Sequence, residues 1–149
     1  MKELTLKQAA LDCGGTLTPE QAEGVVTGVQ IDSRRVKPGD LFVAIRGEKA
    51  DGHNFVDMAA SLGASAALVE QPVKASIPTI LVPDTVKAYG DLAAARRERL
   101  GISVIGITGS VGKTTTKEMT ACMLERTYRT ARTEGNHNNN IGLPMTGRL

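Results

Sequence analysis

A glycine-rich turn that ends in Gly-Lys-Thr is the feature that most constrains how this chain can fold. The stretch "GITGSVGKTTTKEM" runs from Gly106 to Met119. The apolar run "ISVIGITG" predicts a buried strand that enters the turn, and "KTTTKEMTACMLERTYR" predicts a helix that leaves it. Together these elements direct backbone N–H groups and the positive end of a helix dipole at one point, a geometry that binds phosphate.

The spacing of this turn departs from the common phosphate-loop pattern G-x-x-x-x-G-K-[ST]. The first glycine of that pattern would fall at Ile107, so a shortened form remains at 109–114. Lys113 is expected to reach the β- and γ-phosphates of a nucleotide, and the Thr114 hydroxyl to ligate Mg²⁺. Thr115 adds a hydroxyl nearby. The turn therefore predicts nucleotide binding, with a purely structural helix start as the alternative.

The segments upstream alternate between helix and strand patterns. A short helix is expected to begin at Thr5, whose hydroxyl and the Gln8 amide have the spacing of a mutual cap. A second helix is expected to begin at Asp51 or Asn54. The expected strands lie at 24–36, 40–45, 64–70 and 77–83. Such alternation predicts an α/β fold in which part of the sheet is parallel.

A long helix is expected from Asp84 to Gly101, where it would connect two units. The sequence therefore predicts a first domain at 1–83 and a second at 84–149, with the phosphate loop at 109–115.

Composition excludes several classes of function. The chain has 149 residues, of which 41% are hydrophobic, and a net charge of +2 without a long basic run. A nucleic-acid partner is therefore not expected. No apolar run is long enough to cross a membrane, and the two cysteines, Cys13 and Cys122, lack a metal-ligand spacing. We expect a cytoplasmic protein with free, buried or partly buried thiols.

Three stretches in the same order resemble the Mur ligase family of peptidoglycan synthesis. "TGSVGKTTTKEM" resembles the family's ATP loop, and the segment 32–70, which begins "DSRRVKPGDLFVAIRG", resembles its N-terminal domain. "TEGNHNNNIGLPMT", at 133–146, resembles the segment after the ATP loop. The wording of the loop and of the Asn-rich segment is most similar to the member that adds D-alanyl-D-alanine.

The resemblance implies a fold and an activity. The fold would be a small N-terminal α/β domain for the UDP-substrate, followed by the start of a parallel-sheet ATPase domain with its phosphate loop. The activity would be an ATP-dependent ligase that joins D-alanyl-D-alanine to UDP-N-acetylmuramoyl tripeptide through an acyl phosphate, with ATP and Mg²⁺ bound. Positioning and charge neutralisation would dominate such catalysis, with Lys113 as the catalytic residue.

The resemblance also implies site residues. The ATP loop would consist of Gly109, Ser110, Val111, Gly112, Lys113, Thr114 and Thr115. The substrate residues would be Asp32, Ser33 and Arg34 beside UDP, and Asn136, Asn138 and Asn139 between the two substrates.

Simpler roles remain open for several of these residues. Asp32 and Ser33 are also typical of a turn between strands, and the Asn-rich run is also typical of a helix N-cap. The histidines His53 and His137 are expected to have ordinary hydrogen-bonded or exposed roles. Met119, Cys122 and Met123 have the spacing of packing residues on the helix after the loop.

Length is the main departure from the family pattern, because the family's enzymes have three domains. The resemblance therefore implies an inactive fragment of a monomeric enzyme, in which exposed apolar sheet surface would favour self-association. Two other functions stay open: a non-catalytic nucleotide-binding module, and the sister ligase that adds the third peptide residue.

Overall fold

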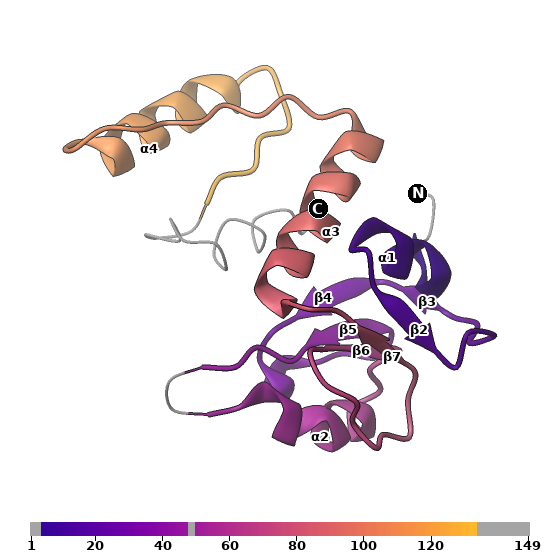
Figure 1. The fold of residues 1–149 in the computed structure, drawn as a ribbon. Helices are drawn as coiled ribbons and strands as arrows, with labels where there is room; N and C mark the ends of the chain where they lie inside the picture. The colour runs from indigo at the N-terminus through magenta and orange to yellow at the C-terminus, as the bar shows by residue number, and fades with distance from the viewer. Residues whose placement is uncertain (1–3, 48–49, 134–149) are drawn as a thin grey trace.

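The computed structural model describes residues 4–47 and 50–133, and its centre is a five-stranded mixed sheet (Figure 1). The strand order is β2-β7-β6-β5-β4. The strands are β2 (Thr16–Thr18), β4 (Gly28–Gln30), β5 (Asp40–Val43), β6 (Ala66–Val69) and β7 (Thr79–Leu81). β4 to β7 are parallel neighbours, and β2 joins β7 antiparallel. The predicted α/β fold with a partly parallel sheet is therefore confirmed.

Alternate residues of the central strands enter two separate cores, as the side-chain period of a strand requires. In β5, Leu41 and Val43 pack on the face covered by α1 (Leu6–Asp12) and α3 (Thr85–Leu100), whereas Phe42 packs on the face covered by α2 (Val56–Ser61). Figure 1 shows α1 and α3 on one side of the sheet and α2 on the other. Because both faces are covered, the central strands β5 and β6 are buried along their whole length, and every residue in them except Asp40 is apolar.

Local capping signals fix the ends of two helices. Thr5 Oγ1 accepts from the Gln8 N–H at 3.2 Å, as predicted for the start of α1. The reciprocal half of that predicted cap is wrong, because the Gln8 amide instead donates to Asp12 Oδ1 at 2.9 Å, one turn later. Asp84 Oδ1 accepts from the Lys87 N–H at the start of α3, which ends at Gly101 with φ 60°.

The helix predicted from Asp51 begins as a 3-10 turn, η2 (Gly52–Phe55), which leads directly into α2. Asp51 caps it by accepting from the His53 N–H at 3.0 Å. Only Val56 and Ala59 of α2 enter the core, whereas the predicted apolar positions Phe55, Met58 and Leu62 are largely exposed, because the helix has too few turns to bury a full stripe.

Two short strands near the N-terminus, β1 and β2, were not expected from the sequence, and the strand expected at 24–36 is divided into β3 and β4. β1 (Leu4–Thr5) pairs antiparallel with β3 (Val25–Val26), apart from the main sheet. β2 lies at the edge of the main sheet, where Leu17 pairs with Ile80. Such pairs join residues distant in sequence, which local patterns do not report.

The predicted strand at 102–109 is wrong for the described residues. This segment runs without regular structure, because none of the described residues pairs with it as a strand requires. Val104 and Ile105 are 62% and 61% exposed.

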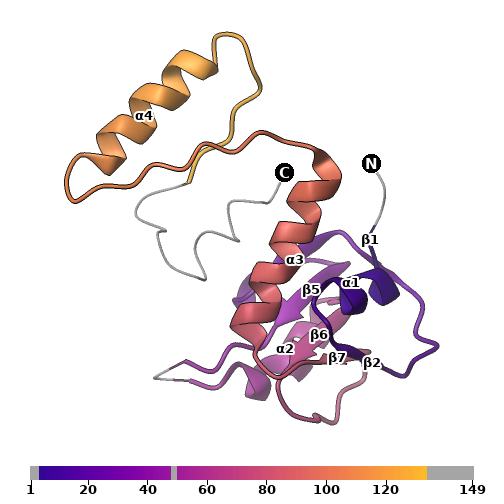
Figure 2. The ribbon, with the colours of Figure 1, turned by 45° about the horizontal axis from the view of Figure 1, so that its top comes forward.

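The last described helix, α4 (Lys113–Leu124), lies away from the sheet (Figure 2). The predicted packing of Met119, Cys122 and Met123 is likewise wrong among the described residues, since all three are exposed. No layer of apolar side chains from the described residues covers these three residues. No helix in the described part of the chain is long and apolar enough to span a membrane.

Candidate functional site: a phosphate loop and a substrate-side edge

The turn before α4 has the backbone that its glycines predict. Gly109 and Gly112 adopt φ 149° and 78°, values that residues with a Cβ rarely reach. Space is not the constraint, because a Cβ at Gly112 would meet nothing within 4 Å. The two glycines are therefore needed for the path of the chain, which curls immediately before the helix begins.

The first turn of α4 has the form of an anion-binding helix start. Gly112 is the N-cap, and no side chain makes a capping hydrogen bond at this end of the helix. Lys113 Nζ donates to the Gly109 carbonyl oxygen at 2.5 Å, which holds the ammonium group across the loop. The helix dipole adds a second positive contribution at the same point.

The seven predicted ATP-loop residues are consecutive, so that 109–112 form the turn and 113–115 begin helix α4. Val111 is 92% exposed, and the Thr114 and Thr115 side chains also lie on the surface. The donor set fits phosphate. For Mg²⁺ it offers the Thr114 hydroxyl, and the described residues hold no group of three His, Cys, Asp or Glu side chains suited to a metal. Because Mg²⁺ is commonly held by few protein ligands plus substrate phosphates and water, one hydroxyl is compatible with it.

A network of ion pairs folds the chain after α4 back along the helix. Lys117 Nζ donates to the Thr133 carbonyl oxygen at 2.6 Å. Arg132 pairs with Glu118 at 3.1 Å and with Glu125 at 2.5 Å. The predicted residues Asn136, Asn138 and Asn139 come directly after this segment and lie outside the described residues.

The second predicted group follows β4, at the carboxyl end of that strand. Asp32 caps the 3-10 turn η1 (Ser33–Arg35) by accepting from the Arg34 N–H at 3.0 Å, so its simpler role as a turn cap is confirmed. It also accepts from Arg34 Nε at 3.0 Å and from an Arg34 terminal nitrogen at 2.8 Å. The Arg34 side chain is 80% exposed. Its guanidinium is therefore both accessible and oriented.

Ser33 differs from its neighbours because it is buried. Its hydroxyl donates to the Met58 sulfur at 3.4 Å, which ties the turn to α2. The hydrogen bonds from the Arg34 side chain, and next from its N–H, hold the pKa of Asp32 below its ordinary value.

Sequence reasoning missed a polar network at the same end of the sheet, which joins Arg46, Asp51, His53 and Glu70. Asp51 Oδ2 accepts from Arg46 Nε at 3.3 Å, and Asp51 Oδ1 contacts His53 Nδ1 at 2.5 Å. His53 Nε2 accepts from the Glu70 N–H at 2.9 Å.

His53 is buried and fully hydrogen-bonded, which confirms the ordinary role expected of it. The His53 N–H, and next its ring, hold the pKa of Asp51 below its ordinary value. The available signal was "DGH" after a buried strand, but the Glu70 partner is too distant in sequence to infer.

The two predicted groups lie on different parts of the molecule. Asp32, Ser33 and Arg34 belong to the sheet unit, whereas the phosphate loop lies beyond the far end of α3 (Figures 1 and 2). The described residues therefore form two separate clusters.

The chain matches known proteins along nearly its whole length. Residues 25–105 match the Mur ligase family, catalytic domain, and residues 107–148 match the Mur ligase middle domain. UDP-N-acetylmuramoyl-tripeptide–D-alanyl-D-alanine ligase of Escherichia coli (strain K12) is 43% identical over 98% of this chain. That match covers 32% of the relative, so the chain spans about a third of its length.

Solved structures agree with the sequence match. Crystal structure I of MurF from Acinetobacter baumannii superposes with a TM-score of 0.91 and 39% identity, over 99% of this chain and 33% of that one. MurF ligase from Thermotoga maritima in complex with ADP gives a TM-score of 0.75 and 37% identity, over 80% of this chain and 28% of that one. The family matches, the relatives and the shared fold together place this chain in the Mur ligase family.

Proposed function

We propose that this chain supplies the UDP-substrate unit and the ATP loop of an ATP-dependent amide-bond ligase. The reaction would add D-alanyl-D-alanine to UDP-N-acetylmuramoyl tripeptide in peptidoglycan precursor synthesis. The observation that carries the proposal is the glycine loop, which has two positive-φ glycines and leads into a helix without a side-chain cap. The chain that contains it is 43% identical, over 98% of its length, to the UDP-N-acetylmuramoyl-tripeptide–D-alanyl-D-alanine ligase of Escherichia coli.

The chain's own residues would bind and position ATP. The N–H groups at the start of α4 would hold the phosphates, and Lys113 would exchange the Gly109 carbonyl for a phosphate oxygen. Mg²⁺, when bound through the Thr114 hydroxyl, would supply charge neutralisation on those phosphates. The γ-phosphoryl group would pass from ATP to the substrate carboxylate, and the amine of D-alanyl-D-alanine would displace phosphate from the acyl phosphate.

Lys113 is the proposed catalytic residue for a physical reason. Negative charge is spread over the phosphoryl oxygens during transfer, and an ammonium group held beside them stabilises that charge without reorganisation. The MurF ligase from Thermotoga maritima was solved in complex with ADP, which supports an adenine nucleotide as the ligand of the loop.

On the substrate side, Asp32, Ser33 and Arg34 would form the UDP contact, with distinct tasks. Arg34 is exposed and can bind an anion, whereas Asp32 orients it. Ser33, whose hydroxyl is turned toward Met58, would fix the turn. The residues proposed between the two substrates are Asn136, Asn138 and Asn139.

We divide the chain into a UDP-substrate unit at 1–83 and an ATP-binding unit at 84–149. α3 would connect the two, because its first half packs through Tyr89 and Leu92 on the core of the sheet unit while its end leads to the loop. We propose a cytoplasmic enzyme that acts as a monomer when whole. The exposed Val104 and Ile105 favour self-association of the chain by itself.

Calorimetric titration of this chain tests the proposal with two ligands, UDP-N-acetylmuramoyl tripeptide and Mg-ATP. We expect the first to bind and the second to bind weakly, with Lys113→Ala abolishing the second. Binding of neither ligand would contradict the proposal. Binding of both without turnover in the complete enzyme would support a non-catalytic nucleotide-binding module instead. A coupled assay of that enzyme with D-alanyl-D-alanine and with single diamino acids separates the two ligases.

A further inference from the structure

The loop from Ile45 to Gly52 is closed at its base by hydrogen bonds. The Gly52 N–H donates to the Ile45 carbonyl at 3.0 Å, and the Gly47 N–H donates to the Ala50 carbonyl at 2.9 Å. A Cβ on Gly52 would lie 2.7 Å from the Ile45 nitrogen, so only glycine allows this close approach. The base of the loop is therefore a defined structure that can position a side chain.

A directed chain of hydrogen bonds runs through this loop to Arg46. Because the Glu70 N–H can only donate, the His53 Nε2 that receives it carries no proton. The imidazole proton of the neutral ring is then on Nδ1, which donates to Asp51 Oδ1 at 2.5 Å. Asp51 uses its other oxygen to accept from Arg46 Nε at 3.3 Å.

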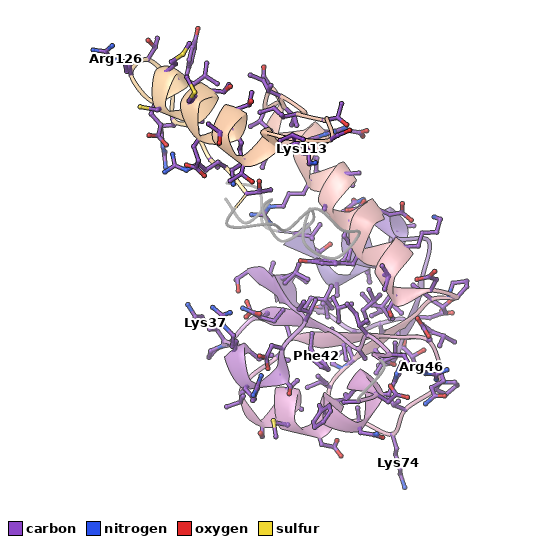
Figure 3. The ribbon with its side chains drawn as sticks, turned by 90° about the vertical axis from the view of Figure 1, so that its left-hand side faces the viewer. Lys37, Phe42, Arg46, Lys74, Lys113 and Arg126 are labelled. Carbon is purple, nitrogen blue, oxygen red and sulfur yellow. The ribbon has the colours of Figure 1, made fainter. Side chains whose placement is uncertain are left out.

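This series of hydrogen bonds starts at the end of a buried strand and ends at an exposed arginine. The side chain of His53 is 2% exposed, and Glu70 directly follows the fully buried strand β6. The side chain of Arg46 is 58% exposed. Its two terminal nitrogens make no hydrogen bond to the described residues. Figure 3 shows Arg46 and Lys37 on opposite sides of Phe42, consistent with Arg46 beyond the carboxyl end of β5.

Arg46 has a counterpart on the neighbouring strand. Gln30 of β4 pairs with Phe42 of β5, and Arg34 and Arg46 each lie four positions beyond that pair. Both guanidinium groups are held by an aspartate, and both follow the carboxyl end of a parallel strand. In open α/β sheets, ligands bind at that edge.

We propose that Arg46 binds the diphosphate of the nucleotide-sugar substrate, and that Asp51 and His53 are positioning residues that orient its guanidinium. This assignment rests on the proposed function of the sheet unit. A guanidinium presents parallel N–H groups that match phosphate oxygens, and holding its Nε in advance reduces the rotamer entropy lost on binding. A buried histidine whose Nε2 accepts from a backbone N–H suits this task because its ring is held in one orientation.

The charge of Arg46 is tested by titrating wild type, Arg46→Gln and the matched control Arg97→Gln with UDP. Arg97 is exposed on α3, so its variant has the same loss of charge away from the edge. Arg46→Gln is expected to weaken UDP binding about tenfold, the effect of one charge-assisted hydrogen bond. It should also flatten the salt dependence of the affinity, whereas Arg97→Gln should leave both unchanged.

Two variants of His53 each retain one of the two hydrogen bonds that its ring makes. The amide of His53→Asn reaches the Nδ1 position and can still donate to Asp51, whereas the amide oxygen of His53→Gln reaches the Nε2 position and can accept from Glu70. We expect His53→Asn to keep more UDP affinity than His53→Gln, although both lower the melting temperature. That order separates positioning of Arg46 from a general loss of stability.

The outcomes distinguish this inference from the proposed function. If wild type does not bind UDP, the proposed UDP-substrate role of the sheet unit fails and the inference fails with it. If wild type binds but Arg46→Gln binds equally well, or no worse than Arg97→Gln, the inference alone is overturned. Equal UDP affinity in the two His53 variants would overturn the positioning role of His53.

Discussion

Replacement of Glu70 by alanine should destabilise the sheet unit through the start of α3. Glu70 Oε1 accepts from both the N–H and the hydroxyl of Thr85, each at 2.9 Å. Thr85 is fully buried, so the variant leaves two donors without their acceptor. An unsatisfied buried donor costs about 1–3 kcal/mol, and we expect a loss of about 3 kcal/mol in the free energy of unfolding.

Urea unfolding followed by circular dichroism measures this loss. The chain has no tryptophan and two tyrosines, of which Tyr89 is buried and Tyr128 exposed, so the near-ultraviolet signal reports mainly the core beside α3. Glu70→Gln keeps an oxygen acceptor and should lose only about 1 kcal/mol. Glu98→Ala, at an exposed position on the same helix, is the matched control and should change little.

A double-mutant cycle with Thr85→Val isolates the bond to the hydroxyl. We expect a coupling energy of about 1 kcal/mol between Glu70 and Thr85. The reasoning would be refuted if Glu70→Ala and Glu98→Ala were equally stable, or if the coupling energy were zero.

Three further predictions address the loops. Gly52→Ala should cost about 2 kcal/mol in urea unfolding, because its Cβ would lie 2.7 Å from the Ile45 nitrogen; an unchanged midpoint would contradict this close contact. Since the folded pKa of Asp32 is lowered, its stabilisation is present above its unfolded pKa of about 3.9 and is lost as pH falls through the folded value. Carbon-detected NMR titration should show this lowered pKa, and Arg34→Gln should raise it. Lys113→Ala should abolish Mg-ATP binding in calorimetry, and unchanged affinity would exclude the lysine from the loop's function.

Features set by a few adjacent residues could be predicted from the sequence. Thr5 and Asp84 start helices because their side chains accept a hydrogen bond from the backbone N–H three residues later. Gly101 ends a helix because it adopts the left-handed conformation. The tight turn before α4 was predictable for the same reason, since Gly109 and Gly112 supply the positive φ that it requires. Local chemistry alone determined these elements.

Features set by distant residues could not be predicted. β2 exists because Leu17 finds Ile80 across the sheet. The proton position on His53 depends on Glu70, which no local pattern connects to it. The segment with Val104 has the pattern of a strand but lacks a partner among the described residues, so apolar periodicity alone overestimated the order there.

NMR mapping of the two ligands tests most directly the central claim that this chain holds two separate sites. The nitrogen-labelled chain would be titrated with UDP-N-acetylmuramoyl tripeptide and then, separately, with Mg-ATP. The account predicts that the first ligand shifts the amide signals of Arg34, Arg46 and His53, and that the second shifts those at 109–115. The account would be contradicted if UDP-N-acetylmuramoyl tripeptide shifted only the signals at 109–115. It would also be contradicted if neither ligand shifted signals in either region.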